Sequence, residues 1–324
     1  MKKTLKYLGY LAIVLVLGVI ALLLYVRMAL PSVPVEDITI EYTQARILRG
    51  EYLANTVTVC MDCHSVRDWS KFSAPPTPGT LGAGGDRFDQ ALGFPGVFYA
   101  KNVTPVGISR YTDGELYRVI TSGVNKEGKA IFPIMPYSYY GKMDREDIYS
   151  IIAYLRNLPP IENEVPDSEP DFPMNFILNT LPAPADPHTQ PPTNDQLAYG
   201  AYLTNAAGCM ECHTNVENGQ IIPELAFSGG REFGFPDGSM LRSTNITPHE
   251  TGIGSWTERM FIVKFKMYAD SSFVLPNVAP GEFNTIMPWT MYGKMKREDL
   301  AAIYAYLRTV KPIENRVEKF TPAQ

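Results

Sequence analysis

Hydrophobic residues form one long block at the start of the chain and only short periodic groups after it. Residues 7–26 carry no charged side chain, three lysines lie among the first six residues, and Arg27 ends the run. Twenty residues at the helical rise span roughly 30 Å, the thickness of the hydrocarbon core of a bilayer. We therefore expect residues 1–30 to form a transmembrane anchor.

A cleaved signal peptide is the alternative for this segment, because it also begins with lysines. Its apolar region is usually shorter, about 7 to 15 residues, and a small-x-small cleavage site follows it. Residues 27–31, Arg-Met-Ala-Leu-Pro, offer no such site. The lysines place the N-terminus in the cytoplasm, so the rest of the chain is expected outside the cytoplasmic membrane.

The remainder of the chain reads as short helices separated by loops. An apolar face begins after Thr43, and a second apolar stripe has i, i+3, i+4, i+7 spacing at Ile148, Ile151, Ile152 and Leu155. Thr112 and Glu115 have the spacing of a capping box, which marks a helix start. Clusters of proline and glycine between these segments exclude long helices and central strands. The pattern predicts an all-α fold.

The order of these features repeats. Corresponding segments are Arg49–Asn55 with Tyr199–Asn205, Asn102–Pro105 with Asn245–Pro248, Tyr140–Met143 with Tyr292–Met295, and Pro160–Asn163 with Pro312–Asn315. Such self-similarity indicates duplication. We expect one domain over residues 41–160 and a similar one over residues 195–318.

Residues 161–194, between the two domains, are rich in proline and acidic residues and predict a semi-rigid, extended linker. No lysine or arginine occurs from residue 157 to 230. This is either a solvated linker with an acidic domain face or a docking surface for a basic partner. Apolar residues between Phe172 and Leu178 predict that part of the linker lies against a domain.

Composition limits the class of partner. A chain of 324 residues is long enough for about two domains. The net charge of -5 argues against nucleic-acid binding, which needs a basic face, and favours protein partners.

All the cysteines of the chain lie in two copies of a C-x-x-C-H motif. The copies are residues 60–64 (Cys-Met-Asp-Cys-His) and 209–213 (Cys-Met-Glu-Cys-His), offset by 149 residues (209 minus 60). In one helical turn, two such thiols face the same way and can add to the vinyl groups of one porphyrin edge, and the histidine can bind the iron. A zinc site, a thioredoxin-like redox pair and two disulfides are the alternatives, but none requires the histidine.

A haem iron has a second axial position, for which the repeat offers two methionine pairs. Met135 and Met287 precede proline, which favours extended backbone that can present a thioether to the iron. Met143 and Met295 directly precede the last helix of each domain, and packing explains them. Asp144 is a good N-cap after Met143, whereas Lys296 replaces that cap in the second copy. We expect Met135 and Met287 to be the distal ligands.

With these motifs in place, the chain resembles the class I c-type cytochromes over roughly residues 41–160 and 195–315. It is most similar to the multihaem cytochrome subunits that accept electrons from membrane-bound alcohol, aldehyde or gluconate dehydrogenases. The resemblance is carried by both C-x-x-C-H motifs, Asn245–Pro248 followed by Gly252–Thr257, and the Ile-Met-Pro segments before helices that end in Ala-Tyr-Leu-Arg. Those subunits usually carry three haem domains, and this chain has two.

The resemblance implies a membrane-anchored dihaem cytochrome c with two tandem class I domains. It would relay single electrons between a dehydrogenase or quinol-oxidising complex and a terminal acceptor, on the periplasmic side of the bacterial inner membrane. It implies redox protein partners, with no catalytic residue, no small-molecule substrate and no nucleic acid. The expected haem residues are Cys60, Cys63, Cys209 and Cys212 for two covalent haem c groups, and His64, Met135, His213 and Met287 as axial ligands of iron.

Other functions remain open. The dihaem subunit of a cbb3-type oxidase likewise joins an anchor helix to two class I domains. A dihaem peroxidase or a gas sensor needs an open or displaceable distal position, against which the paired Met-Pro motifs argue.

Overall fold

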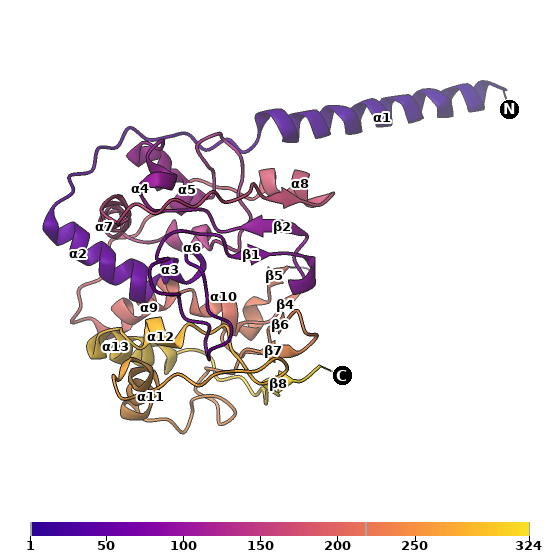
Figure 1. Cartoon of the computed structure of the whole chain (residues 1–324). Helices are drawn as coiled ribbons and strands as arrows, with labels where there is room; N and C mark the ends of the chain where they lie inside the picture. Colours follow the sequence, from indigo (N-terminus) through magenta and orange to yellow (C-terminus); the bar gives the residue numbers. More distant parts are fainter. Residues whose placement is uncertain (1, 218, 324) are drawn as a thin grey trace.

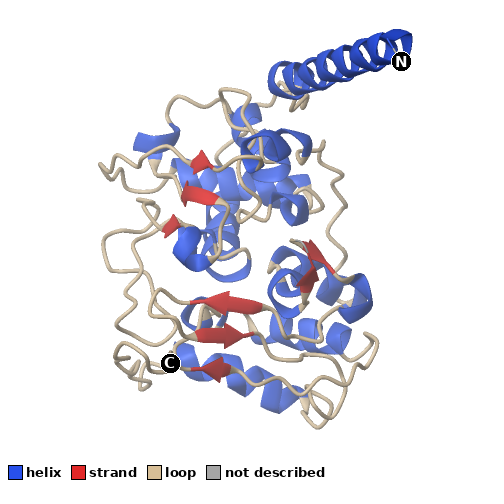
Figure 2. Ribbon diagram, turned by 90° about the vertical axis from the view of Figure 1, so that its right-hand side faces the viewer, coloured by secondary structure: helices blue, strands red, loops and turns tan. Residues whose placement is uncertain are grey.

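The computed structural model describes residues 2–217 and 219–323. Helix α1 (Lys2–Ala29) extends away from the rest of the molecule (Figures 1 and 2). Its apolar window has a mean hydropathy of 2.7 and is 0% buried. By length and composition α1 can therefore cross a membrane, a test that a signal sequence near the N-terminus also passes.

The first half of the remaining chain is built of short helices that agree with the sequence pattern. Thr112 and Glu115 form the predicted capping box, and Asp144 caps the last helix of this half by accepting a hydrogen bond from Glu146 N. The elements are α2 (Gln44–Tyr52), the π-helical turn η1 (Leu53–Val57), α3 (Cys60–Cys63), η2 (Gln90–Leu92), α4 (Pro105–Ile108), α5 (Asp113–Ser122), α6 (Tyr137–Tyr140) and α7 (Arg145–Arg156).

The second half has counterparts of the five helices α2, α3, α5, α6 and α7, in the same order. Lys296 makes no side-chain capping bond to the helix that follows it, unlike its counterpart Asp144. The elements are α9 (Gln196–Ala206), α10 (Cys209–His213), η4 (Pro223–Leu225), α11 (Glu258–Lys266), η5 (Met267–Ala269), α12 (Trp289–Tyr292) and α13 (Arg297–Leu307).

In each half the first and last helices cross at a glycine. A Cβ on Gly50 would lie 1.8 Å from Ser150 O of α7, and a Cβ on Gly200 would lie 1.9 Å from Ala302 O of α13. Only a residue without a side chain allows backbones to approach so closely. The repeated glycine therefore fixes the same helix crossing in both halves.

Short antiparallel strands occur in the loop-rich segments, so the all-α expectation omitted part of the structure. The strands are β1 (Arg87–Phe88), β2 (Gly96–Tyr99) and β3 (Glu169–Pro170), paired in that order, β4 (Val216–Glu217) with β5 (Gln220–Ile221), and β6 (Glu232–Gly234), β7 (Met240–Arg242) and β8 (Phe320–Thr321), paired in that order. Some pairings are local hairpins, such as β4 with β5 and β6 with β7, whereas β3 and β8 pair with strands far away in the sequence, which local alternation does not reveal.

The linker is extended only in part, because it contains α8 (Met174–Ile177) and η3 (Leu178–Thr180). Leu178 is buried with Phe88 and Phe98 of the first half, which confirms that apolar linker residues lie against a domain. Asn179 Nδ2 donates a hydrogen bond to Val26 O, at a distance of 3.4 Å, so this part of the linker also contacts the end of α1 (Figure 1).

The two halves meet through reciprocal contacts between equivalent residues. Tyr52 Oη donates to Asp299 Oδ2 at 2.5 Å, and Tyr202 Oη donates to Asp147 Oδ2 at 2.6 Å. Each tyrosine oxygen also accepts a backbone N–H at the start of the opposite helix, from Lys296 N at 3.0 Å and Asp144 N at 3.2 Å. The interface is thus close to twofold symmetric at these positions.

Candidate haem-attachment sites

The two C-x-x-C-H motifs adopt the same local structure. Each forms a short helix, α3 or α10, entered through a residue in the left-handed region: Val59 with φ 44° and Gly208 with φ 62°. Glycine adopts this conformation without steric cost, whereas a β-branched valine is strained there. Both motifs are therefore entered through the same left-handed backbone conformation, at a higher conformational cost in the first half.

Both histidines are oriented by a backbone carbonyl. Nδ1 of His64 lies 2.6 Å from Lys101 O, and Nδ1 of His213 lies 2.7 Å from Thr244 O. Since a carbonyl only accepts, Nδ1 carries the proton and Nε2 keeps its lone pair. Burial lowers the pKa of both histidines, which favours the neutral imidazole. Both rings are therefore prepared to bind a metal through Nε2, as haem iron requires.

The four cysteines are unpaired, and those of each motif lie one helical turn apart. Burial raises the pKa of the Cys63 and Cys209 thiols to about 12 and that of Cys212 to about 11, and it also raises the pKa of Cys60. Within residues 2–217 and 219–323, no group of three or more His, Cys, Asp or Glu side chains is arranged to hold a metal ion. The thiols thus fit addition to a porphyrin edge, with the adjacent imidazole as the ligand of iron.

A buried tyrosine supports the segment before each motif. Tyr140 Oη donates to Thr58 O at 2.9 Å, and Tyr292 Oη donates to Ala207 O at 2.6 Å. Burial raises the pKa of both phenols well above the usual value, so they remain hydrogen-bond donors. The sequence repeat contains this tyrosine pair, but only the structure reveals its connection to the attachment motif.

The repeated Asn-x-Thr-Pro segment explains how the carbonyl acceptors are held. In the first half, Asn102 Oδ1 accepts from Thr104 N at 2.9 Å, and Asn102 Nδ2 donates to Ile161 O at 2.8 Å. Asn245 makes the same pair of contacts in the second half, with Thr247 N at 2.9 Å and Ile313 O at 2.8 Å. These bonds fix the residues directly after Lys101 and Thr244, whose carbonyls orient the histidines.

The charged residues beside the motifs differ between the halves. Arg67 is buried between Asp62 (3.3 Å) and Asp86 (2.6 Å) in the first half. Burial raises the pKa of Asp62 to about 6, although Arg67 opposes this shift. In the second half, Glu211 replaces Asp62 and pairs with Arg231. The acid of each motif is thus paired with an arginine, which comes from a different place in the chain in each half.

The two methionine pairs have different surroundings. Met143 and Met295 are each 1% exposed and belong to the core, as expected for packing residues. Met135 and Met287 are only partly buried, at the edge of the same core, and directly precede the Pro residues that start α6 and α12. Neither the thioether-to-imidazole geometry nor the ligand role is fixed by these contacts, so distal ligation stays a prediction.

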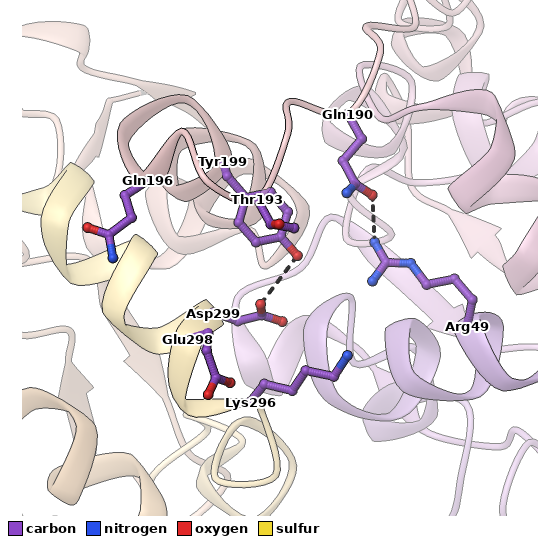
Figure 3. A pocket seen from close by; sticks show the side chains of 8 residues that line it. All are labelled: Arg49, Gln190, Thr193, Gln196, Tyr199, Lys296, Glu298 and Asp299. Carbon is purple, nitrogen blue, oxygen red and sulfur yellow. Dashed lines mark hydrogen bonds between the residues drawn. The ribbon is translucent and has the colours of Figure 1, made fainter.

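A polar cleft of about 410 Å³ lies between the halves (Figure 3). Two of its charged groups have partners: Arg49 pairs with Asp147 at 2.8 Å and Gln190 at 2.9 Å, and Asp299 accepts from Tyr199 at 3.3 Å. The cleft is thus part of the interface between the halves, and its lining contains none of the predicted haem residues.

Comparison with known proteins identifies the second half. Residues 197–311 match the family model described as cytochrome c, so this part of the chain is a cytochrome c domain, which binds haem covalently and serves electron transport. This confirms the family resemblance read from the motifs.

Curated relatives extend the similarity over most of the chain. The cytochrome c subunit of the quinone-dependent alcohol dehydrogenase of Gluconacetobacter polyoxogenes is 27% identical over 289 residues, which cover 83% of this chain and 57% of that protein. The fructose dehydrogenase cytochrome subunit of Gluconobacter japonicus is 27% identical over 296 residues, covering 86% and 55%. A diheme cytochrome c-type protein of Cereibacter sphaeroides is 27% identical over 269 residues, covering 79% and 83%.

The chain spans just over half the length of the two dehydrogenase subunits. Its match to the diheme protein covers most of both chains.

Proposed function

We propose that the chain is a membrane-anchored dihaem cytochrome c that relays single electrons outside the cytoplasmic membrane. The observation that carries this proposal is the repetition, around His64, of the contacts made by His213 in the cytochrome c domain. Both imidazoles bind a carbonyl through Nδ1, and both motifs are supported by a buried tyrosine. Residues 41–160 are therefore proposed as a second cytochrome c domain, tandem to residues 195–318.

Haem, when bound, supplies an iron that changes oxidation state by one electron. Thioether bonds would form at Cys60 and Cys63 for the first haem and at Cys209 and Cys212 for the second. His64 and His213 would supply Nε2 to the irons, with Nδ1 restrained by the carbonyls of Lys101 and Thr244. Met135 and Met287 would provide the opposite ligands. With an imidazole and a thioether bound to each iron, no position on it would be left for substrate, which favours a relay over a peroxidase or a sensor.

The interface between the halves suits electron exchange within the chain. Tyr139 follows Met135 by four residues, and its Oη donates to Glu211 Oε2, inside the second attachment motif, at 3.1 Å. Asn205 Nδ2, just before that motif, donates to Tyr139 O at 2.9 Å. The proposed distal segment of the first haem thus contacts the attachment segment of the second.

The anchor and the partners complete the proposal. Helix α1 would hold the protein in the bacterial inner membrane with both haems on the periplasmic side. The protein should then resist alkaline carbonate extraction, whereas a soluble protein beginning near residue 30 would identify a cleaved signal. By analogy with the named relatives, the electron donor would be a dehydrogenase. A quinol-oxidising complex is the alternative donor. Copurification after mild detergent extraction tests that partner.

Replacement of the methionines tests the relay function. The oxidised protein should show the near-infrared sulfur-to-iron band, and the reduced protein should scarcely bind carbon monoxide. Met135→Ala should open the first haem and Met287→Ala the second, each lowering the potential of that haem, because a thioether favours ferrous iron. Met143→Leu and Met295→Leu are the matched controls and should leave the spectrum unchanged. Carbon monoxide binding by the unmodified protein would instead support a peroxidase or sensor.

A further inference from the structure

A loop of the first half reaches across to the segment that carries Met287. Phe72 N donates to Pro276 O at 2.9 Å, and Val278 N donates to Ser70 O at 2.8 Å. Lys71 and Asn277 form an antiparallel bridge between these bonds. Residues 69–74, named here the clasp, thus pair with a second-half segment far away in the sequence.

One side chain of the clasp holds the backbone on both sides of the Met287–Pro288 bond. Ser73 Oγ donates to Met287 O at 2.6 Å and accepts from Trp289 N at 3.0 Å. Ser73 N in turn donates to Asn284 Oδ1 at 2.9 Å. Trp289 N also donates to Met287 O at 2.8 Å within the turn, so the Ser73 hydroxyl adds a bond from the first half to each of these two groups. A single hydroxyl therefore restrains the turn that carries the proposed ligand.

The clasp is held in a conformation that its sequence does not favour. Ser73 and Ala74 have φ of 67° and 39°, and they are 2% and 0% exposed. Non-glycine residues adopt such angles at a cost, and the surrounding contacts must stabilise them. Part of that stabilisation comes from Phe72, whose ring stacks on Tyr268 at 5.8 Å and lies 6.3 Å from Phe283. The strained backbone aims the Ser73 hydroxyl at the Met287 turn.

The clasp is also fixed to the first attachment motif. Arg67, which pairs with Asp62 of that motif at 3.3 Å, lies over the Trp69 ring with Cζ 4.4 Å from its centroid. Trp69 O accepts from Asn284 Nδ2 at 3.3 Å. A continuous series of contacts therefore connects the first attachment motif with the segment that precedes Met287.

The corresponding turn at Met135 is held within its own half. Tyr137 N donates to Met135 O at 2.7 Å, as Trp289 N does to Met287 O at 2.8 Å, and Met135 N donates to Phe132 O at 3.4 Å. Among residues 2–217 and 219–323, no hydrogen bond joins residues 132–136 to the second half. The restraint across the interface is therefore specific to the Met287 turn.

We propose that Ser73 is a positioning residue for the distal ligand of the second haem, so that the first half keeps Met287 at its iron. This inference rests on the proposed function, in which Met287 is that ligand. Removing the hydroxyl takes away its bonds to Met287 O and Trp289 N, while the turn keeps its internal bonds from Trp289 N to Met287 O at 2.8 Å and from Met287 N to Thr285 Oγ1 at 3.0 Å. With two hydrogen bonds lost, we expect the fraction of second haem without its methionine to rise by about tenfold.

Ser73→Ala in the full chain, purified with both haems, tests the proposal. Two readouts are needed: a redox titration that resolves both haems, and carbon monoxide binding to the reduced protein. The variants Met135→Ala and Met287→Ala show which step of the titration belongs to which haem. Ser73→Ala should lower the potential of the haem that Met287→Ala alters and should increase carbon monoxide binding to that haem. The potential of the haem that Met135→Ala alters should stay unchanged.

Ser70→Ala is the matched control, since Ser70 Oγ bonds to Asp68 and not to the Met287 turn. Asn284→Ala removes the bonds to Ser73 N and Trp69 O and should shift the same component, which keeps the test usable if Ser73→Ala does not accumulate. The positioning role is wrong if Met287→Ala alters the potential of the second haem but Ser73→Ala and Asn284→Ala leave it unchanged, as Ser70→Ala should. If Met287→Ala changes neither haem, the ligand assignment itself fails.

Discussion

The two halves share the contacts that surround a haem-attachment motif but differ in what lies around them. His64 and His213 have equivalent carbonyl partners, whereas the entry residue is Val59 in one half and Gly208 in the other. Within residues 2–217 and 219–323, only the second half has its Met-Pro turn hydrogen-bonded by the opposite half, through Ser73. We infer that the two halves attach haem in the same way, but that the turn carrying the proposed distal methionine is held differently in each half.

The largest effect should come from removing an attachment thiol. Cys60→Ala should leave the chain with haem only in the second half, and Cys212→Ala with haem only in the first, because each motif serves its own half. Haem per chain, measured after denaturation, should fall from two to one in each variant. Loss of both haems from either single variant would show that the halves do not acquire haem independently.

A similarly symmetric but smaller effect is expected at the helix crossings. Gly50→Ala and Gly200→Ala would place a methyl group 1.8 Å from Ser150 O and 1.9 Å from Ala302 O. The helices must separate, which should lower the free energy of unfolding by about 3 kcal/mol in each case. Urea denaturation of the haem-loaded protein measures this.

Leu48→Ala, at a 55% exposed position of α2, is the control and should cost under about 0.5 kcal/mol. Equal stability of Gly50→Ala and unmodified protein would contradict the close crossing.

The interface tyrosines should reveal an asymmetry. Asp299 is buried and accepts two tyrosine hydrogen bonds, the shorter from Tyr52 and the other from Tyr199 at 3.3 Å. Tyr52→Phe removes the shorter bond and should lower the free energy of unfolding by about 2 kcal/mol. Tyr202→Phe should cost about 1 kcal/mol, because Asp147 retains its ion pair with Arg49. Urea denaturation of both variants measures the two losses of unfolding free energy. A larger loss for Tyr202→Phe than for Tyr52→Phe would contradict the expected asymmetry.

The smallest effect is expected at the core methionines. Met143→Leu and Met295→Leu conserve volume at fully buried sites and should each cost about 1 kcal/mol or less. Thermal unfolding and the near-infrared spectrum check this together. A lost sulfur-to-iron band in either variant would mean that this pair, not Met135 and Met287, binds iron.

Features encoded by neighbouring residues could be predicted from the sequence. The capping box at Thr112 and Glu115 and the N-cap at Asp144 depend on groups two or three residues apart, and both are present. The attachment motifs are also encoded by neighbouring residues. The sequence repeat included Asn102 and Asn245, but it did not reveal their hydrogen bonds.

Features that depend on distant partners could not be predicted. The two-residue strand β3 pairs only because the linker returns to β2. The clasp requires Ser73 and Ala74 in left-handed conformations, which nothing in their residue types favours, and it joins Ser73 to a carbonyl at Met287. The histidine acceptors at Lys101 and Thr244 were missed because a backbone carbonyl leaves no signature in the sequence.

Counting covalent haem tests the central claim most directly. The purified full-length protein would be denatured, extracted with acidic organic solvent to remove free haem, and assayed as the pyridine haemochrome against protein concentration. The account predicts two haems per chain that resist extraction. One haem per chain, carried by residues 197–311 alone, would contradict the proposed duplication of the site, and none would contradict the haem interpretation of both motifs.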